Sequence, residues 1–191
     1  MNARTLALAL LLTNVPVAAF SAGRVLSTDG VLTSGDAVLK AGDALPNAEV
    51  RLASGTATLA LDGGRFLLKG PARFTPRKSQ FRLDLGSLLT VLKSRAGRRF
   101  SVRTPAAVAA VRGTDFFVSV GSKQEVDVCI CRGALEVTAK GMEKLPMAAE
   151  HHLNYRFWIV KSGTAREESP MIGHTDDELD VLHGLLAAEK P

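Results

Sequence analysis

The sequence predicts an all-β domain followed by a C-terminal extension that ends in one short helix. Between residues 23 and 140, apolar and polar residues alternate in short runs, and Gly, Asp, Ser or Pro separates these runs roughly every 7–12 residues. The chain has 17 glycines among 191 residues and only 5% aromatic residues, which suits small aliphatic strands joined by tight turns. Near the C-terminus, a capping-box pattern followed by periodic leucines predicts the helix.

The N-terminal residues 1–21 are predicted to be a secretory signal peptide. Arg4 supplies a positive charge, an apolar run follows at residues 6–12, and small residues surround the expected cleavage point. A proline interrupts the apolar stretch, which is too short to cross a bilayer core of about 30 Å as a helix. We expect the mature chain to begin between Phe20 and Gly23, to lack a transmembrane anchor, and to be periplasmic or secreted. The alternative is a buried N-terminal helix.

The predicted β domain covers residues 23–140. Its runs show the period-two alternation of half-buried strands, with turn residues such as the Asp-Gly-Gly sequence at 62–64 between them. Many short strands at even spacing indicate a short β-solenoid or a two-sheet sandwich. The main predicted strands are at 48–52, 56–61, 65–68, 80–85, 87–92, 100–102, 115–120, 125–131 and 134–138.

Residues 141–191 form the predicted extension, whose pattern is less regular. Thr175 and Glu178 have the spacing of a capping box, and the leucines that follow are expected to pack on the β domain. His183 is expected to be an ordinary surface residue. The expected segments are an irregular stretch at 145–152, one strand at 155–160, a loop at 162–173 and a helix at about 176–188.

The stretch from residue 100 to residue 118 resembles the signature of the FecR domain. It reads Phe-Ser-Val-Arg-Thr-Pro-Ala-Ala-Val-Ala-Ala-Val-Arg-Gly-Thr-Asp-Phe-Phe-Val, and a strand with a Gly-containing turn follows at 131–137. The resemblance implies a module that takes part in signalling across the cell envelope, or in extracytoplasmic assembly, through contacts with an envelope protein partner. The motif residues are Thr104, Pro105, Val111, Arg112, Gly113, Thr114 and Phe116.

The resemblance also implies how this chain differs from full-length FecR regulators. Those proteins place a cytoplasmic segment that binds a sigma factor, and then a transmembrane helix, ahead of the module. Here a predicted signal peptide stands in that place. We therefore expect an exported adaptor or ligand-binding version of the module.

Elementary chemistry gives the same motif a structural interpretation. Pro105 forces the residue before it towards extended geometry and has no N–H to donate, which suits the end of a strand. Gly113 permits a bend that other residues tolerate less easily. Arg112 is expected to hold this corner through backbone carbonyls, or through a carboxylate such as Asp115 or Asp127.

Catalysis and nucleic-acid binding are not expected. The sequence has no Gly-x-Ser-x-Gly elbow, no His-Glu-x-x-His and no glycine-rich phosphate loop. The net charge of +5 is modest, and no aromatic residues alternate with the central basic ones. Those basic residues either keep strands soluble or form a positive face for acidic glycans, anionic lipids or an acidic partner. They are Arg77, Lys78, Arg82, Lys93, Arg95, Arg98, Arg99 and Arg103.

Cys129 and Cys131 are the two cysteines of the chain, and their spacing places both on one face of a strand. In an extended strand their Cα atoms would lie about 6.5–7 Å apart, at or beyond the upper limit for a disulfide. Three interpretations remain open. The cysteines are buried small hydrophobes, or they form a strained or intermolecular disulfide, or they belong to a zinc or copper site.

The metal hypothesis takes its imidazole ligands from His151, His152 and His174. Adjacent histidines in an extended segment point to opposite sides, so at most one of His151 and His152 is expected to bind. The extension would then be held by metal rather than by a large apolar interface. This hypothesis gives the alternative function, a periplasmic metal- or small-ligand-binding protein.

Overall fold

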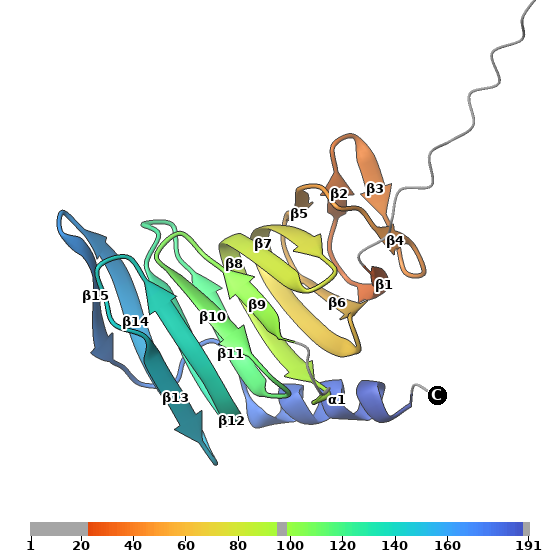
Figure 1. The fold of residues 1–191 in the computed structure, drawn as a ribbon. Coiled ribbons are helices and arrows are strands. Elements are labelled where there is room, and N and C mark those ends of the chain that lie inside the picture. The colour runs from red at the N-terminus through yellow and green to blue at the C-terminus, as the bar shows by residue number, and fades with distance from the viewer. Residues whose placement is uncertain (1–22, 95–98, 189–191) are drawn as a thin grey trace, which may run out of the picture.

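The computed structural model describes residues 23–94 and 99–188, and this part of the chain consists mostly of β-strands (Figure 1). A single helix, α1 (Asp176–Ala187), follows the last described strand. The prediction of an all-β fold with one short C-terminal helix is confirmed. The predicted signal peptide at 1–21 lies outside the described residues, as do Arg95 and Arg98. None of the described helical structure is long and apolar enough to cross a membrane.

Fifteen strands lie in the described part of the chain, and the longest ones are in its middle. The strands of the first half are β1 (Gly23–Thr28), β2 (Leu32–Ser34), β3 (Ala37–Leu39), β4 (Ala44–Leu45), β5 (Val50–Leu52), β6 (Thr56–Leu61), β7 (Gly64–Arg77) and β8 (Gln80–Leu92). Those of the second half are β9 (Phe100–Arg103), β10 (Ala107–Val111), β11 (Asp115–Val120), β12 (Val126–Ala139), β13 (Leu145–Ala149), β14 (Leu153–Val160) and β15 (Gly163–Glu168).

Hydrogen bonds join these strands into one network. Its main path runs β15-β14-β12-β10-β9-β8-β7-β5-β2-β3, and every described pair is antiparallel except β8 with β9. The long strands change partner along their length. Strand β8 pairs first with β9 and then with β11, and β12 pairs first with β11 and then with β10. The assignment to a short solenoid or a sandwich stays a prediction.

Two apolar clusters lie on opposite faces of the central strands. Alternation along β11 sends Phe116 and Val118 into the main core, whereas Phe117 points to the other face. On that second face, side chains from β8, β11 and β12 meet the leucines of α1, which lies along one side of these strands (Figure 1). The expected packing of the helix on the β domain is therefore observed. The second cluster contains Leu89, Val91, Phe117, Cys129, Cys131, Leu179, Leu182 and Leu186.

The sheet continues past residue 140, and this part differs from the sequence prediction. Strands β13 and β14 both pair with β12, and β15 pairs with β14. The predicted irregular stretch at 145–152 and the predicted loop at 162–173 are wrong where β13 and β15 lie. Pro146 and the charged run at 166–168 obscured the strand pattern, although strands near a sheet edge tolerate both. The extension is thus held by paired strands and buried leucines, contrary to the expectation of no large apolar interface.

Candidate metal centre

Strand β12 places both thiols under the helix. Val128 and Ile130 enter the main core, so Cys129 and Cys131 face the second cluster, where they are 0% and 3% exposed. Pairing with β11 shifts by one residue between Asp115 and Phe116, which leaves Cys131 as the extra residue of a β-bulge. Both cysteines are free, so the structure contains no disulfide between them.

His152 reaches this face from the turn between β13 and β14. Its φ of 36° is left-handed, and its backbone N–H donates to the carbonyl of Cys131 at 3.2 Å. The imidazole Nδ1 lies 3.7 Å from the Sγ of Cys129. Two residues expected to be extended therefore form a bend, and the rings of His151 and His152 lie side by side, 4.5 Å between centroids, rather than on opposite sides. His151 stays at the surface, with 73% of its side chain exposed.

His174 approaches the thiols from the segment just before α1. Its ring stacks on Phe117, with centroids 4.6 Å apart and planes at 20°, and its Nε2 lies 3.2 Å from the Sγ of Cys131. Gly173 makes this approach possible, because a Cβ there would lie 2.6 Å from the Phe117 ring and its φ is +78°. Thr175 then caps the helix: its hydroxyl accepts from the Glu178 N–H, completing the predicted capping box.

The potential ligand atoms of four residues therefore converge. The sulfurs of Cys129 and Cys131 and one ring nitrogen each of His152 and His174 all lie within 4.8 Å of one another. The structure brings together four of the five residues named by the metal hypothesis and leaves His151 outside this group. Metal binding itself stays a prediction.

The two thiols differ in their tendency to ionise. A hydrogen bond from Cys131 lowers the pKa of Cys129 to about 5, against the effect of burial and with further help from His174 and His152. The same hydrogen bond raises the pKa of Cys131, and burial adds to this rise. Cys129 is therefore the more readily ionised of the two thiols.

His152 is held between the thiol of Cys129 and a carboxylate. Burial lowers the pKa of His152, but its hydrogen bonds to Asp176 and Cys129 outweigh burial, and the net shift is upward. Its Nε2 lies 2.9 Å from Oδ1 of Asp176, in the first turn of α1. The hydrogen bond to His152 lowers the pKa of Asp176 in turn. The contact thus links the β13–β14 turn to the start of the helix.

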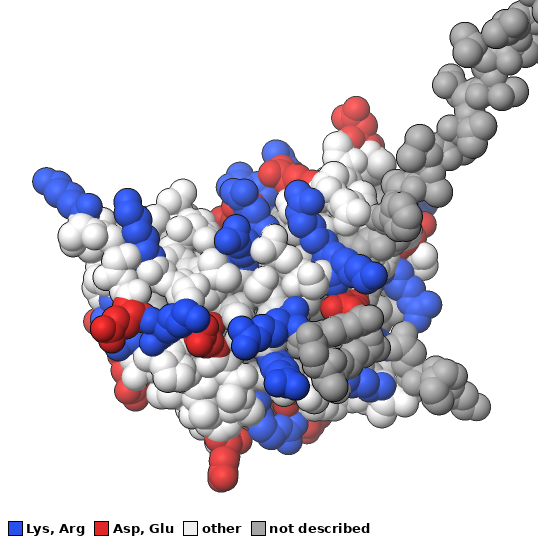
Figure 2. Space-filling model, in the orientation of Figure 1, with Lys and Arg blue, Asp and Glu red and all other residues white. Residues whose placement is uncertain are grey.

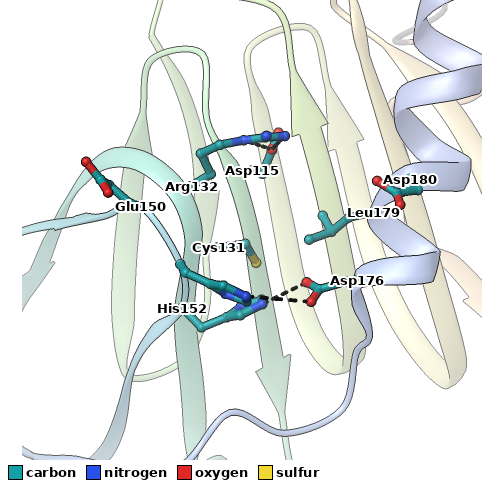
Figure 3. Close-up of a pocket in the computed structure, with 9 residues that line it drawn as sticks. Asp115, Cys131, Arg132, Glu150, His152, Asp176, Leu179 and Asp180 are labelled. Carbon is teal, nitrogen blue, oxygen red and sulfur yellow. Dashed lines mark hydrogen bonds and ion pairs between the residues drawn. The ribbon is translucent and has the colours of Figure 1, made fainter.

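A cavity of about 220 Å³ lies beside Cys131 and is lined mainly by polar side chains (Figure 3). Asp176 and Asp180 border it from the helix, and Glu150 borders it from the β13–β14 turn. Arg132 also lines it, but its guanidinium is held by Asp115. The acidic lining makes the cavity a favourable route for a cation towards the thiols.

A second polar group lies next to the cavity, and the sequence did not predict it. Asp115 is 5% exposed, and its Oδ2 accepts hydrogen bonds from Arg132 at 2.7 and 3.0 Å and from His183 at 2.9 Å. The expectation that His183 is an ordinary surface residue is therefore wrong. The sequence offered one signal, an aspartate within a strongly apolar strand, but not its partners.

The same contacts correct one of the two expectations for Arg112, that it pairs with the carboxylate of Asp115 or Asp127. Asp127 is paired with Arg156, at 3.0 Å, and Asp115 is paired with Arg132, whereas the side chain of Arg112 is exposed. Register explains the difference: Asp115 lies directly opposite Arg132, and Asp127 lies opposite Arg156. Cross-strand neighbours therefore supply the cations, and sequence neighbours do not.

The remaining motif residues make contacts within the fold. The Thr104 hydroxyl and backbone N–H both bond to the Ala107 carbonyl, which closes the β9–β10 turn ahead of Pro105. Thr114, 2% exposed, donates to the carbonyl of Ala134 at 2.8 Å. At Gly113, where φ is +66°, a Cβ would lie 2.4 Å from Ser94. Val111 and Phe116 are buried in the main core.

On the face shown in Figure 2, Lys and Arg side chains are interspersed with Asp and Glu side chains. Arg82 lies beside Arg103 across the β8–β9 pair, but its Nε is 2.9 Å from Asp84. Nearby, Arg51 and Arg73 both approach Glu49, at 2.7 and 4.0 Å. Acidic neighbours therefore offset part of the positive charge in this region.

The comparisons with known proteins bear on the central part of the chain. Residues 46–136 match the model of the family described as FecR protein. The resemblance to the FecR family is confirmed. This FecR segment, residues 46–136, includes both cysteines, whereas His152, His174 and α1 follow it. Comparison with curated proteins gave no match.

Two crystal structures of candidate anti-sigma factors from Parabacteroides distasonis resemble the chain. The first, at 1.65 Å resolution, is 14% identical over 64% of this chain and 60% of its own, with a TM-score of 0.54. The second, at 2.50 Å, is 13% identical over 76% of this chain and 58% of its own, with a TM-score of 0.42. The chain spans about 60% of the first structure's length, and that likeness shows a shared fold.

Proposed function

We propose that this chain is an exported, non-enzymatic sensing module of the cell envelope that acts through contacts with a protein partner. The observation that carries the proposal is the FecR match over residues 46–136. FecR proteins are regulatory rather than enzymatic, and a protein that shares the fold is described as a candidate anti-sigma factor. A module of this kind works by changing which protein it binds, and it needs no catalytic group.

Export is the part of the proposal that rests on the N-terminal sequence. Residues 1–21 have the charge, apolar run and small residues of a cleavable leader. Two free thiols on a secreted protein would meet an oxidising environment. Their complete burial under α1 is compatible with that environment.

Export is tested by locating the full chain in the cell and determining its N-terminus. A tagged chain expressed in a Gram-negative host is expected in the osmotic-shock fraction, with its N-terminus between Phe20 and Gly23. The matched control is Leu10→Arg, which places a charge in the apolar run of the leader and should leave the chain unprocessed. A wild-type chain that keeps Met1 and stays in the cytosol would overturn export.

Partner binding is tested separately, in the envelope of the organism that encodes the chain. Cross-linking followed by purification should give one protein reproducibly, and the two purified proteins should then form a complex in isolation. Failure of the purified pair to associate, or turnover of a substrate by the chain alone, would contradict a contact-based role.

A metal-binding protein is the second candidate function, and the convergence of Cys129, Cys131, His152 and His174 favours it. The two functions differ in whether the bound ion must be released. A carrier must pass its ion to an acceptor, whereas a sensing module can hold one permanently as part of its structure. Rapid transfer of bound zinc to an excess of competing chelator, without unfolding, would favour the carrier.

A further inference from the structure

We propose that Cys129, Cys131, His152 and His174 form a four-ligand zinc site that fastens the C-terminal extension to the FecR segment. The two sulfurs come from β12, inside residues 46–136, and the two imidazoles come from beyond it. The site would therefore join two parts of the chain that are far apart in sequence. The evidence for this site is the geometry of its side chains, which is independent of any protein partner.

The distances between the ligand atoms suit a tetrahedral ion. With Zn–S near 2.3 Å and Zn–N near 2.0 Å, the edges of an S₂N₂ tetrahedron are about 3.3–3.8 Å long. The Cys129–His152 edge is 3.7 Å and the Cys131–His174 edge is 3.2 Å, and every edge is within 4.8 Å. Small side-chain shifts are enough to bring all four atoms onto one ion.

Both imidazoles are oriented as metal ligands usually are. His152 turns Nδ1 to Cys129, while its Nε2 donates to the carboxylate of Asp176 at 2.9 Å. His174 turns Nε2 to Cys131, while its Nδ1 donates to the carbonyl of Ile172 at 3.1 Å. In each ring the outer nitrogen donates to an oxygen, so the inner nitrogen is the one that could offer a lone pair to an ion. Outer-shell acceptors of this kind fix the tautomer and orientation of zinc-bound histidines.

A packing role for the cysteines explains less of this arrangement. Thiols that only fill space need apolar neighbours, which Leu89 and Leu182 already supply in the same cluster. His174 is 5% exposed, and enclosing an imidazole against two sulfurs is costly unless both ring nitrogens are satisfied. An ion shared by all four residues satisfies the inner nitrogens and both sulfurs together.

The residues around the proposed site include an acidic cavity and the first turn of α1. The acidic cavity lies beside Cys131 and attracts cations to the edge of the cluster. His174 precedes the N-cap Thr175 directly, and Asp176 in the first turn holds His152. Zinc would therefore fix the start of α1 on the sheet.

The direct test uses the full mature chain, purified in reducing buffer and stripped with a chelator. Titration with Co²⁺ should give, at about one equivalent, intense tetrahedral d–d bands and a thiolate-to-cobalt charge-transfer band, and Zn²⁺ should abolish both. X-ray absorption of the zinc form should show two sulfur and two nitrogen neighbours. The proposal is wrong if cobalt gives only weak octahedral bands, or if Cu⁺ binds through the two sulfurs while zinc does not bind.

Substitutions distinguish zinc binding by the four proposed ligands from non-specific metal binding at the surface. Cys129→Ser with Cys131→Ser should abolish binding, but these buried changes also risk unfolding. Asp176→Asn changes a carboxylate that is 62% exposed and keeps the fold, and it should weaken zinc binding roughly 10–100-fold. Asp177→Asn, which removes another exposed carboxylate from the same first turn but lies outside both candidate ligand groups, is the matched control and should bind as wild type. Equal affinities for Asp176→Asn and Asp177→Asn would overturn the assignment.

Discussion

At the scale of single residues, Gly173 determines where His174 can lie. Its positive φ of +78° turns the chain onto the sheet, and its missing side chain lets the backbone meet the Phe117 ring. Phe117 in turn supports the imidazole of His174 by stacking. A residue with no polar side chain thus positions one of the four proposed ligands.

We predict that Gly173→Ala weakens zinc binding at least tenfold and lowers stability, because the new Cβ displaces the 172–174 segment from Phe117. The matched control is Gly35→Ala, also at positive φ (+56°) but with no atom within 4 Å of the added Cβ. That control should cost only the left-handed strain, about 1–2 kcal/mol, and leave zinc binding unchanged. Zinc titration and urea unfolding measure both effects, and equal zinc affinities for the two variants would contradict the argument.

Part of the site can be predicted from the sequence. Because side chains alternate along a strand, the sequence places Cys129 and Cys131 on one face and Val128 and Ile130 on the other, as the structure shows. The same reasoning failed for His152, whose left-handed φ cannot be read from a period-two pattern. It could not find His183 either, because the contact of that residue with Asp115 depends on how the helix lies across the sheet.

At the scale of elements, α1 is attached to the sheet by apolar and charged contacts together. Leu179, Leu182 and Leu186 cover the second cluster. Lys69 on β7 donates to Glu178 and to the carbonyl of Gly173, both at 2.8–2.9 Å. These contacts attach the helix to the sheet without using any of the four proposed ligands, so zinc would add to an existing attachment.

We predict that Leu182→Ala lowers the free energy of unfolding by about 2–5 kcal/mol, because it removes a side chain that is 1% exposed from the cluster under the helix. Val181→Ala, at a neighbouring position that is 63% exposed, is the control and should change stability by less than about 0.5 kcal/mol. Chemical unfolding of both variants without metal provides the comparison. Similar losses for both would mean that the helix is not packed as described.

The elements were predicted unevenly for a physical reason. The capping box and leucine period are local signals, and they predicted α1 within about a residue at each end. Strands β13 and β15 have short, charged or proline-containing sequences, and they form because β12 and β14 offer free edges for pairing. Such strands depend on partners distant in sequence, which a pattern of apolar residues does not reveal.

At the scale of the whole molecule, the FecR segment and the extension share strands as well as a site. Strand β12 pairs with β10 and β11 from the segment and with β13 and β14 from the extension. Unpairing the extension would therefore expose one edge of a central strand. We expect the described parts to unfold together rather than in separate steps.

We predict that zinc stabilises the entire fold by simple linkage. At a free zinc concentration 100 times its Kd, the free energy of unfolding should rise by about 2.7 kcal/mol. The urea midpoint should increase with an unchanged slope, and the sheet and helix signals should shift together. If zinc delays only the loss of the helix signal, the extension unfolds independently and this prediction fails.

The complete cover over the two thiols has a chemical consequence. Cys129 is the more readily ionised thiol, and ionisation makes a sulfur reactive towards oxidants. Neither cysteine is more than 3% exposed, however, because His152, His174 and the leucines of α1 lie over them. A fragment cut at the limits of the family match, residues 46–136, would keep both sulfurs and lose their cover. In the oxidising compartment proposed for this chain, such a fragment would be open to sulfenic acid formation and to mixed disulfides with other proteins. In the proposed compartment, α1 would therefore limit the access of oxidants to the two thiols of the segment before it.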